Sequence, residues 1–385
     1  MQETSPMNLL DQFPDLSSLR QLAHKKLPNV AITYLESATA SNEVIKSNLA
    51  ELEKIKFASS AFHGEINVQS DTTFMGKRYD LPIGIAPIGM SGFIWPNAEN
   101  ILANFAVKNN LPFVLSHVAC ESINSLNVEN YENIWFQLYP PKDEGELDFY
   151  LEQCSGKNVR TLVITVDLPR PSVREDQIKS GLTIPPTFSP KQLINMATKP
   201  RWLLGHLING RPVLKSYQEF HGNISSSGST SHIGYQTRTA VSKAYLKMVR
   251  SKWKGNLICK GITNFNDAII ASESGIDVIW VSNHGGRQSP CAPSLLNTLE
   301  NIRTNIDLPL IYDGGVRSSM DILRAINFGA DLVMMGRPWH IALGALGSYG
   351  PAHLRDVLMR EMISIMWQLG LKRPHEIRDL VRILE

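Results

Sequence analysis

Short apolar runs alternate with amphipathic stretches eight times between residues 81 and 335, and this pattern limits the fold more than any other feature of the chain. The runs are Leu81–Ala86, Pro112–Ser116, Ile134–Leu138, Thr161–Asp167, Leu257–Lys260, Val278–Asn283, Leu310–Asp313 and Leu332–Met335. Helical patterns include Ala98–Asn109, Asp267–Ser274, Leu295–Thr304, Ser319–Phe328 and His353–Leu369. Strands that alternate with helices predict a parallel sheet, and eight such units predict an α/β fold of the (β/α)₈ or TIM-barrel type. A doubly wound open sheet is the alternative, although no G-x-G-x-x-G follows an early run.

The segments that flank the eight units predict additions to one domain that spans residues 1–385. Residues 1–58 carry apolar side chains at helical spacing, with a break at Pro28, and predict an N-terminal helical cap. The barrel is expected over 81–340 and C-terminal helices over 351–385. The connection after the fourth run, residues 175–256, is far longer than an ordinary loop and predicts a functional insertion.

Composition and charge narrow the class of partner. The chain has 385 residues, 43% of them hydrophobic, and a formal net charge of +2, which gives no reason to expect nucleic acid. Its four cysteines lack metal or redox spacing, so we expect reduced thiols and no metal. Met1–Pro6 has no signal-peptide pattern, and no run approaches the roughly 18 apolar residues of a spanning helix. These features together predict a cytoplasmic protein.

The insertion contains two unlike halves. Residues 191–215 mix lysine and arginine with leucine, isoleucine and tryptophan, which is typical of a segment that lies on a membrane surface. A lid helix packed on the barrel mouth explains the same composition equally well. The second half includes Ser225–Ser231, a low-complexity run that predicts a mobile loop.

Polar residues collect at the predicted strand ends, where a barrel of this class places its active site. The richest cluster is Ser282–Gln288, which follows a buried strand and contains His284, two glycines and Arg287. A histidine titrates near neutral pH and suits a general base, and a guanidinium matches a carboxylate. Asp167 is a candidate to hold His284 in one tautomer, or alternatively caps its own turn. Arg174 adds a second guanidinium beside the same mouth.

The last two strand ends predict a phosphate site. Asp313-Gly314-Gly315-Val316-Arg317 and Gly336-Arg337 lie in the two loops from which barrels build such sites. Backbone N–H groups beside glycine and the start of a helix both favour an anion. Lys260, at the fifth strand end, either stabilises negative charge on a cofactor or lies at the rim. A phosphate site beside a base and a carboxylate clamp predicts a phosphorylated cofactor that reacts with a small acid.

These residues resemble one family, the FMN-dependent 2-hydroxy-acid oxidases and dehydrogenases. Ser282–Gln288 is similar to the active-site signature of that family, and the similarity extends from Leu27-Pro28 to Arg337-Pro338. The resemblance implies that His284, Asp167, Arg287 and Tyr139 are catalytic, and that Tyr34, Tyr139, Arg174 and Arg287 bind the substrate. It implies that FMN is held by Pro87, Ile88, Gly89, Ser116, Gln137, Thr165, Lys260, Ser282, Asp313, Gly315, Arg317, Gly336 and Arg337.

Several positions depart from the family pattern, and one of them is the run Ala38-Thr39-Ala40-Ser41, which replaces a Gly and acidic run after the first tyrosine. Ile88 replaces a frequent threonine, and Pro290 replaces the usual aspartate soon after the signature. Gly89 stands where oxidases of small acids tend to have alanine, and Val118 where glycolate oxidase has a tryptophan. The last two changes predict a roomier pocket, for a longer aliphatic or an aryl 2-hydroxy acid.

The sequence therefore predicts FMN-dependent oxidation of an (S)-2-hydroxy acid, lactate-like or mandelate-like, to the 2-oxo acid. A dehydrogenase that passes electrons to a quinone or another carrier is favoured by the basic, apolar segment 191–215. That segment also predicts peripheral contact with the inner face of the membrane. An oxidase that uses oxygen is the first alternative, and a flavin-binding isomerase without net redox chemistry is the second. By analogy with the family, we expect a homo-oligomer, a tetramer.

Overall fold

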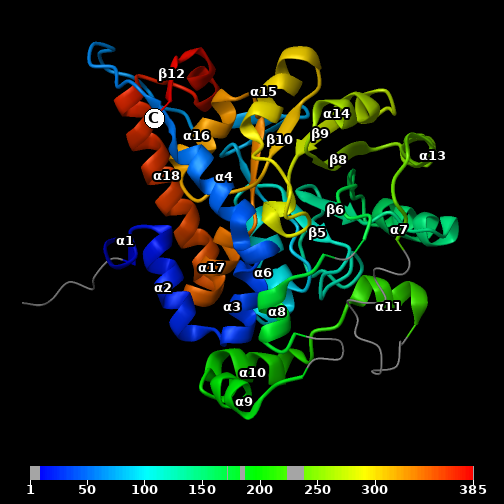
Figure 1. Cartoon of the computed structure of the whole chain (residues 1–385). Coiled ribbons are helices and arrows are strands. Elements are labelled where there is room, and N and C mark those ends of the chain that lie inside the picture. Colours follow the sequence, from blue (N-terminus) through cyan, green and yellow to red (C-terminus); the bar gives the residue numbers. More distant parts are fainter. Residues whose placement is uncertain (1–8, 171, 183–186, 223–237, 385) are drawn as a thin grey trace, which may run out of the picture.

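The computed structural model describes residues 9–170, 172–182, 187–222 and 238–384. Eight parallel strands close into a barrel in the order β10-β11-β4-β5-β6-β7-β8-β9 (Figure 1). The strands are β4 (Ile83–Ile85), β5 (Phe113–Ser116), β6 (Ile134–Leu138), β7 (Thr161–Thr165), β8 (Asn256–Ile262), β9 (Val278–Val281), β10 (Leu310–Tyr312) and β11 (Leu332–Met335). All eight predicted runs are strands, and the (β/α)₈ prediction is confirmed.

Side chains alternate between the barrel interior and the surrounding helices, because successive residues of a strand point to opposite faces. Val114, Trp135, Val163, Ile258 and Trp280 belong to one buried cluster, inside the barrel. Their strand neighbours pack into a second and larger cluster with the outer helices. The next inward-pointing residue of each strand, two positions further along, therefore lies at the carboxyl end of the barrel.

Helices cover the outside of the barrel. They are α5 (Ser91–Ile94), α6 (Ala98–Lys108), α7 (Glu144–Gly156), α13 (Lys243–Lys252), α14 (Phe265–Ser272), α15 (Leu296–Asn305), α16 (Ser319–Asn327) and α17 (Arg337–Leu346). N-caps start several of them: Asp143 accepts from Glu146 N, and Ser318 forms a capping box with Asp321. No helix in the described ranges is long and apolar enough to cross a membrane.

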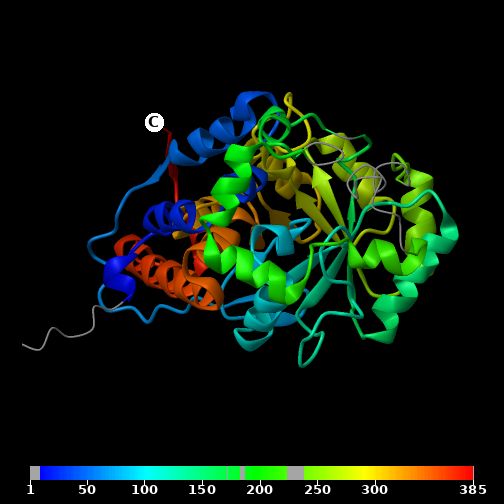
Figure 2. The same ribbon diagram turned by 90° about the horizontal axis from the view of Figure 1, so that it is seen from below.

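The N-terminal cap and the C-terminal segment lie together on one side of the barrel (Figures 1 and 2). The cap contains α1 (Leu9–Gln12), α2 (Leu16–Lys26), α3 (Asn29–Glu36), η1 (Ala40–Asn42) and α4 (Glu43–Glu53). The chain ends with η3 (Gly347–Tyr349), α18 (Gly350–Leu369), η4 (Pro374–Asp379) and β12 (Arg382–Leu384). Helices were expected over 351–385, but β12 is a strand that pairs antiparallel with β1 (Ile55–Phe57). Backbone pairing between distant segments leaves no local pattern in the sequence.

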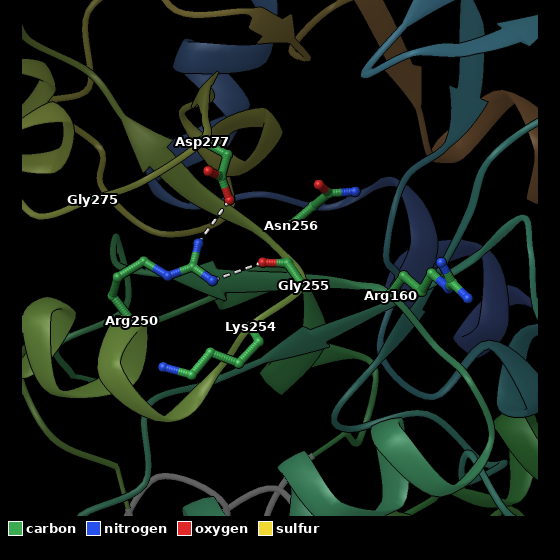
Figure 3. A pocket seen from close by; sticks show the side chains of 7 residues that line it. All are labelled: Arg160, Arg250, Lys254, Gly255, Asn256, Gly275 and Asp277. Atoms are coloured by element: carbon green, nitrogen blue, oxygen red, sulfur yellow. Dashed lines mark hydrogen bonds and ion pairs between the residues drawn. The ribbon is translucent and has the colours of Figure 1, made fainter.

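The amino end of the barrel is closed by protein. The hairpin of β2 (Thr72–Phe74) and β3 (Lys77–Tyr79) contributes Phe74 and Tyr79 to the interior cluster, and Phe74 stacks on Trp135 with ring centroids 6.2 Å apart. A surface groove at the strand starts is lined by Arg160, Arg250, Lys254, Gly255, Asn256, Gly275 and Asp277 (Figure 3). Arg250 there donates to Asp277 at 2.8 Å and to Gly255 O at 2.8 Å. Packing and local hydrogen bonds therefore hold the amino end of the barrel together.

The insertion after β7 forms α8 (Glu175–Lys179), α9 (Pro190–Ala197), α10 (Pro200–Asn209) and α11 (Lys215–His221). It was expected to reach residue 256, but α13 already belongs to the outer ring that precedes β8. The low-complexity run Ser225–Ser231 and the start of the chain, Met1–Pro6, lie outside the described residues. Trp202 of α10 is buried and donates to Phe93 O at 3.2 Å, which fixes α10 beside the barrel mouth.

Candidate active site

The carboxyl end of the barrel presents a ring of inward residues that follow the interior cluster along each strand. They are Ala86, Ser116, Gln137, Thr165, Lys260, Ser282, Asp313 and Gly336. All except Ala86 were predicted from the sequence to contact the cofactor. Polar side chains occupy most positions of this layer, whereas the layer below it, inside the barrel, is apolar.

A cavity of about 960 Å³ opens above this ring, within the range of cofactor and substrate sites. Fourteen of the predicted site residues line it: Tyr34, Pro87, Ile88, Gly89, Tyr139, Arg174, Lys260, His284, Arg287, Asp313, Gly315, Arg317, Gly336 and Arg337. Five do not line it, namely Ser116, Gln137, Thr165, Asp167 and Ser282, and of these Ser116, Gln137, Thr165 and Ser282 are buried at strand ends.

The loop after β9 has an unusual backbone. His284, Gly285 and Gly286 (η2, His284–Gly286) have φ values of 57°, 59° and 77°. A left-handed histidine costs about 1–3 kcal/mol and persists only where its surroundings impose it. Here Ser282 Oγ accepts from His284 N at 3.1 Å, and Thr39 of the cap donates to Gly286 O at 3.1 Å. The cap and β9 therefore hold the loop in this conformation.

His284 pairs with Asp167 at the barrel mouth. Its Nδ1 lies 3.1 Å from both carboxylate oxygens, and the two side chains are 17% and 11% exposed. Burial lowers the pKa of His284 below its usual range, although the Asp167 charge partly opposes that shift. Burial raises the pKa of Asp167, but the contact with His284, the charge of Lys260 and a backbone hydrogen bond together outweigh it, and the net pKa is lowered. The pair therefore combines an ionised carboxylate with a neutral imidazole at neutral pH, the form that accepts a proton.

Lys260, Ser282 and Asp313 form a buried polar cluster. Lys260 Nζ donates to Ser282 Oγ at 2.7 Å and lies 3.1 Å from Asp313 Oδ2. Ser282 Oγ in turn donates to Asp313 Oδ1 at 2.7 Å. These contacts connect the ends of β8, β9 and β10 into one rigid floor.

Three arginines converge on the mouth, and backbone oxygens orient them. Arg174 Nε donates to Arg287 O at 3.2 Å. Arg287 Nη1 donates to Tyr34 O at 2.9 Å and to Ser37 O at 2.8 Å. Arg337, expected only at a phosphate, donates to the carbonyls of Leu35, Gly285 and Ser37 at 3.0–3.2 Å. The carbonyl end of α3 is electronegative, so it attracts both guanidinium groups.

A buried amide pair that the sequence did not reveal joins the cap to the signature loop. Asn48 Nδ2 donates to Asn283 Oδ1 at 3.0 Å, and Asn283 Nδ2 donates to Asn48 Oδ1 at 2.8 Å. Both residues are 2% exposed. Asn48 also packs against Gly315, where a Cβ would come within 3.1 Å of it. One helical asparagine therefore contacts two loops of the mouth.

The room expected at Gly89 is already filled. A Cβ on Gly89 would lie 2.6 Å from Cγ2 of Val118 and 3.7 Å from the Tyr34 hydroxyl. The prediction of extra space from the missing methyl is therefore wrong, because the neighbouring valine packs into it. Apolar side chains further along the cavity include Met90, Phe93, Phe188 and Leu214.

Unsatisfied groups at the mouth test whether the site fits FMN. Gln137 Nε2 and Thr165 Oγ1 are buried and lack a hydrogen-bond partner within the described chain, which is costly unless a ligand supplies one. Burial lowers the pKa of Arg317 and of Arg337, and in the described ranges their guanidinium groups bond only to backbone carbonyls. Hydrogen-bonding groups at the floor and cations at the side fit a ring system joined to a phosphate.

Comparison with known proteins agrees with this chemistry. The family model for FMN-dependent dehydrogenases matches residues 23–383. The chain is 32% identical to an L-lactate dehydrogenase of Pseudomonas syringae, over 94% of this chain and 96% of that protein. It is 33% identical to an L-lactate dehydrogenase of Bartonella quintana, over 93% and 94%. It superimposes on the crystal structure of the monotopic membrane protein (S)-mandelate dehydrogenase with a TM-score of 0.87 and 27% identity, covering 96% and 99% of the two chains. The chain therefore belongs to the family of FMN-dependent dehydrogenases, and it is an oxidoreductase with FMN as its cofactor.

Proposed function

We propose that this protein oxidises an (S)-2-hydroxy acid to the corresponding 2-oxo acid and acts as a dehydrogenase. The observation that carries the proposal is the His284–Asp167 pair, which adjoins a cavity lined by Arg174 and Arg287. The lactate dehydrogenases and the mandelate dehydrogenase that resemble the chain support the same substrate class. A base and an anion clamp in one cavity suit an acid that loses a proton beside its carboxylate.

FMN is held, in this proposal, by the ring of strand ends. The backbone of Pro87, Ile88 and Gly89 and the side chains of Ser116, Gln137, Thr165, Lys260 and Ser282 bind the ring system. The loops after β10 and β11 bind the phosphate through Asp313, Gly315, Arg317, Gly336 and Arg337. When bound, FMN accepts the two electrons that leave the substrate. The partnerless Gln137 Nε2 and Thr165 Oγ1 support this assignment.

The chain's own residues orient the acid and move its proton. Arg174 and Arg287 bind the carboxylate, and Tyr34 and Tyr139 contact the carboxylate and the hydroxyl. The contact with Asp167 keeps the one proton of the neutral imidazole on Nδ1. His284 Nε2 therefore accepts the proton of the substrate. Asp167 then stabilises the imidazolium. The lowered pKa of His284 keeps this base unprotonated at neutral pH.

The acceptor proposal depends on α9 and α10. Their outward side chains include Ile194, Leu204, Leu207 and Ile208, which are 66%, 55%, 72% and 82% exposed. Lys191, Lys199, Arg201 and Arg211 lie in the same segment, and a basic, apolar surface favours an anionic lipid headgroup region. We infer that the protein binds the inner membrane face peripherally and passes electrons to a quinone or another carrier.

Anaerobic flavin bleaching tests the reaction. The FMN-loaded protein is mixed in parallel with (S)-lactate, (S)-mandelate and glycolate, and absorbance near 450 nm is followed. At least one acid bleaches the flavin if the proposal is right, whereas a flavin that stays oxidised with all three supports the isomerase. Admission of air then separates the two acceptors: slow reoxidation supports the dehydrogenase, and fast reoxidation with stoichiometric peroxide supports the oxidase.

Vesicle sedimentation tests the membrane contact. The holoenzyme should sediment with vesicles that contain anionic phosphatidylglycerol, and the double variant Leu207→Glu/Ile208→Glu should stay in the supernatant. Val381→Glu is the matched control, because Val381 is 84% exposed on another part of the molecule. Equal sedimentation of all three proteins contradicts the proposal. Size-exclusion chromatography of the same samples tests the predicted homo-oligomer.

A further inference from the structure

The buried amide pair of Asn48 and Asn283 joins the helical cap to the loop that carries the proposed base. The pair is reciprocal, with donor-to-acceptor distances of 3.0 and 2.8 Å, and both residues are 2% exposed. Asn283 Nδ2 also donates to Pro293 O at 3.1 Å. Both amide hydrogens of Asn283 and its oxygen are therefore used. Together these bonds fix one orientation of the Asn283 side chain.

His284 follows Asn283 directly, so the amide pair acts on the backbone from which the imidazole projects. Asn283 has φ and ψ of −103° and 26°, and His284 has a left-handed φ of 57°. From this backbone, His284 Nδ1 lies 3.1 Å from both carboxylate oxygens of Asp167. A rotation of the Asn283 backbone would carry the imidazole away from Asp167, because the two residues share a planar peptide bond. The anchored side chain of Asn283 opposes that rotation.

Other contacts of the cap hold the far end of the same loop. A Cβ on Gly286 would lie 3.2 Å from Cβ of Val44 and 3.3 Å from Cγ1 of Ile45, so α4 packs closely against this glycine. Thr39 donates to Gly286 O through its N at 3.1 Å and through its Oγ1 at 3.0 Å. The cap therefore holds the loop at Gly286 by packing and backbone bonds, and at Asn283 by the amide pair.

Asn48 also lies against the loop after β10, which in the proposed function binds the phosphate of FMN. A Cβ on Gly314 would lie 3.3 Å from Asn48 Nδ2, and a Cβ on Gly315 would lie 3.1 Å from both Cβ and O of Asn48. One residue of α4 thus contacts the loop of the base and the loop of the cofactor. The position of Asn48 therefore sets the spacing between the two loops.

The polar character of the pair indicates positioning rather than stability alone. Replacing both partners of a buried hydrogen bond with apolar groups of the same shape is often nearly neutral for stability. A fully satisfied buried polar pair, by contrast, specifies one arrangement, because its hydrogen bonds are directional. The Asn48–Asn283 pair thus supplies a directional restraint that apolar packing at the same place lacks.

We propose that Asn48 is a positioning residue for the oxidation, and that through Asn283 it holds His284 at a fixed place relative to the loop that binds the cofactor. This proposal rests on the proposed function and adds to it a residue that does not line the cavity. Asn48 transfers no proton and binds no substrate in this scheme. Its effect reaches the reaction only through His284.

Anaerobic stopped-flow reduction of the FMN-loaded, full-length protein tests the proposal, with whichever of (S)-lactate and (S)-mandelate bleaches the flavin. Asn48→Ala should lower the rate constant at saturating acid roughly 10- to 100-fold, since a misplacement of about 1 Å can cost about 100-fold. Bound FMN should be retained on ultrafiltration, because alanine keeps the Cβ and the carbonyl that pack on Gly315. Asn327→Ala is the matched control: it also removes a buried helical amide, which bonds to Ile377 O and Leu380 O, and it should change the rate less than about twofold.

A double-mutant cycle with His284→Asn separates positioning from a merely structural role. If Asn48 acts through the imidazole, Asn48→Ala should lower the rate of the His284→Asn protein by less than about threefold. A structural role, or an effect on the cofactor alone, lowers the rate by the same factor in both backgrounds. Equal factors therefore overturn the proposal. An Asn48→Ala rate close to that of the unaltered protein, or loss of FMN from this variant, overturns it as well.

A second variant decides the question if Asn48→Ala does not fold. Asn48→Leu/Asn283→Leu replaces both amides with apolar side chains of similar size, so urea denaturation should show only a small change in stability. Its rate constant should still fall roughly 10- to 100-fold, and a rate near that of the unaltered protein overturns the proposal. If acids bleach the flavin and the cycle is additive, only the assignment of Asn48 fails. If no 2-hydroxy acid bleaches the flavin of the unaltered protein, the proposed function fails as well.

Discussion

The two ends of the barrel are made by the same eight strands and differ in almost every other respect. At the amino end, Phe74, Tyr79 and Trp135 pack inside the barrel. At the carboxyl end, the interior opens into a cavity of about 960 Å³ above a polar floor. Apolar packing therefore stabilises the amino end, whereas the carboxyl end carries buried polar groups and cations that a ligand must satisfy.

Arginines show the same contrast. Arg250 at the amino end is neutralised by Asp277 at 2.8 Å and by local carbonyls, as Figure 3 shows. At the mouth, Arg317 and Arg337 bond to backbone carbonyls, and burial lowers their pKa. An arginine paired with a carboxylate stabilises the fold locally, whereas buried arginines without one favour an anionic ligand.

The largest effect is expected from His284→Asn at the mouth. Asparagine tolerates the left-handed backbone but cannot act as the base, so the anaerobic rate of flavin reduction should fall roughly 10²- to 10⁴-fold. Bound FMN should be retained, since His284 is not assigned to hold it. Arg160→Met at the other end serves as the control. A His284→Asn rate close to that of the unaltered protein would show that the imidazole is not the base.

Asp167→Asn tests the role of the His284 base through the pH dependence of the rate. Removing the carboxylate should lower the rate roughly 10²-fold, because the imidazolium loses its stabilising charge. In the unaltered protein the rate should rise with pH, with a midpoint below the usual histidine range, since the pKa of His284 is lowered. The Asp167 charge raises that pKa, so its loss should move the midpoint to lower pH. A pH–rate profile checks this; a midpoint that moves upward contradicts the assignment.

Phe74→Ala tests the opposite end. Phe74 is 2% exposed and stacks on Trp135, so its truncation should cost about 3–5 kcal/mol of unfolding free energy. Urea denaturation measures that loss. The rate of flavin reduction should remain within about twofold, because Phe74 packs at the opposite end of the barrel and contributes no side chain to the cavity. A large rate loss would show that the two ends are coupled, and the contrast drawn between them would be wrong.

The smallest effect concerns acid stability. Burial lowers the pKa of His117 to about 3 and that of His340 to about 4. Because the unfolded chain binds these protons near pH 6.5 and the folded chain does not, stability falls as pH falls below that value. Each histidine contributes about 1.4 kcal/mol per pH unit until its folded pKa is reached. Urea unfolding at pH 7, 6 and 5 should show a shallower slope for His117→Gln/His340→Gln, and an identical slope refutes the assignment.

The barrel could be predicted because parallel strands buried on both faces leave continuous apolar runs. The strand ends could be predicted for the same reason, since an inward-pointing residue lies near the carboxyl end of each run: Gln137, Lys260 and Asp313 follow this rule. The helical cap was visible from its apolar spacing. Its contact with the mouth was not, because Asn48 looks like an ordinary polar residue of a helix until Asn283 is brought beside it.

Other contacts at the mouth could not be predicted from the sequence. Arg287 and Arg337 bond to carbonyls near the end of α3, and every residue of any chain has such an acceptor. Arg238 follows a serine-rich run, and its backbone bridge to Pro141 accompanies the stacking of its guanidinium on Tyr139. Space at Gly89 was misjudged because Val118 comes from a different strand end. Each case depends on a contact between residues far apart in the chain.

A crystal structure of the FMN-loaded protein with a bound 2-oxo acid tests the central claim most directly. The account predicts that the ring system lies on the floor of Gln137, Thr165 and Lys260, with His284 Nε2 within hydrogen-bond distance of the acid and its carboxylate on Arg174 and Arg287. Density for the acid away from His284, or with its carboxylate turned from both arginines, would contradict it.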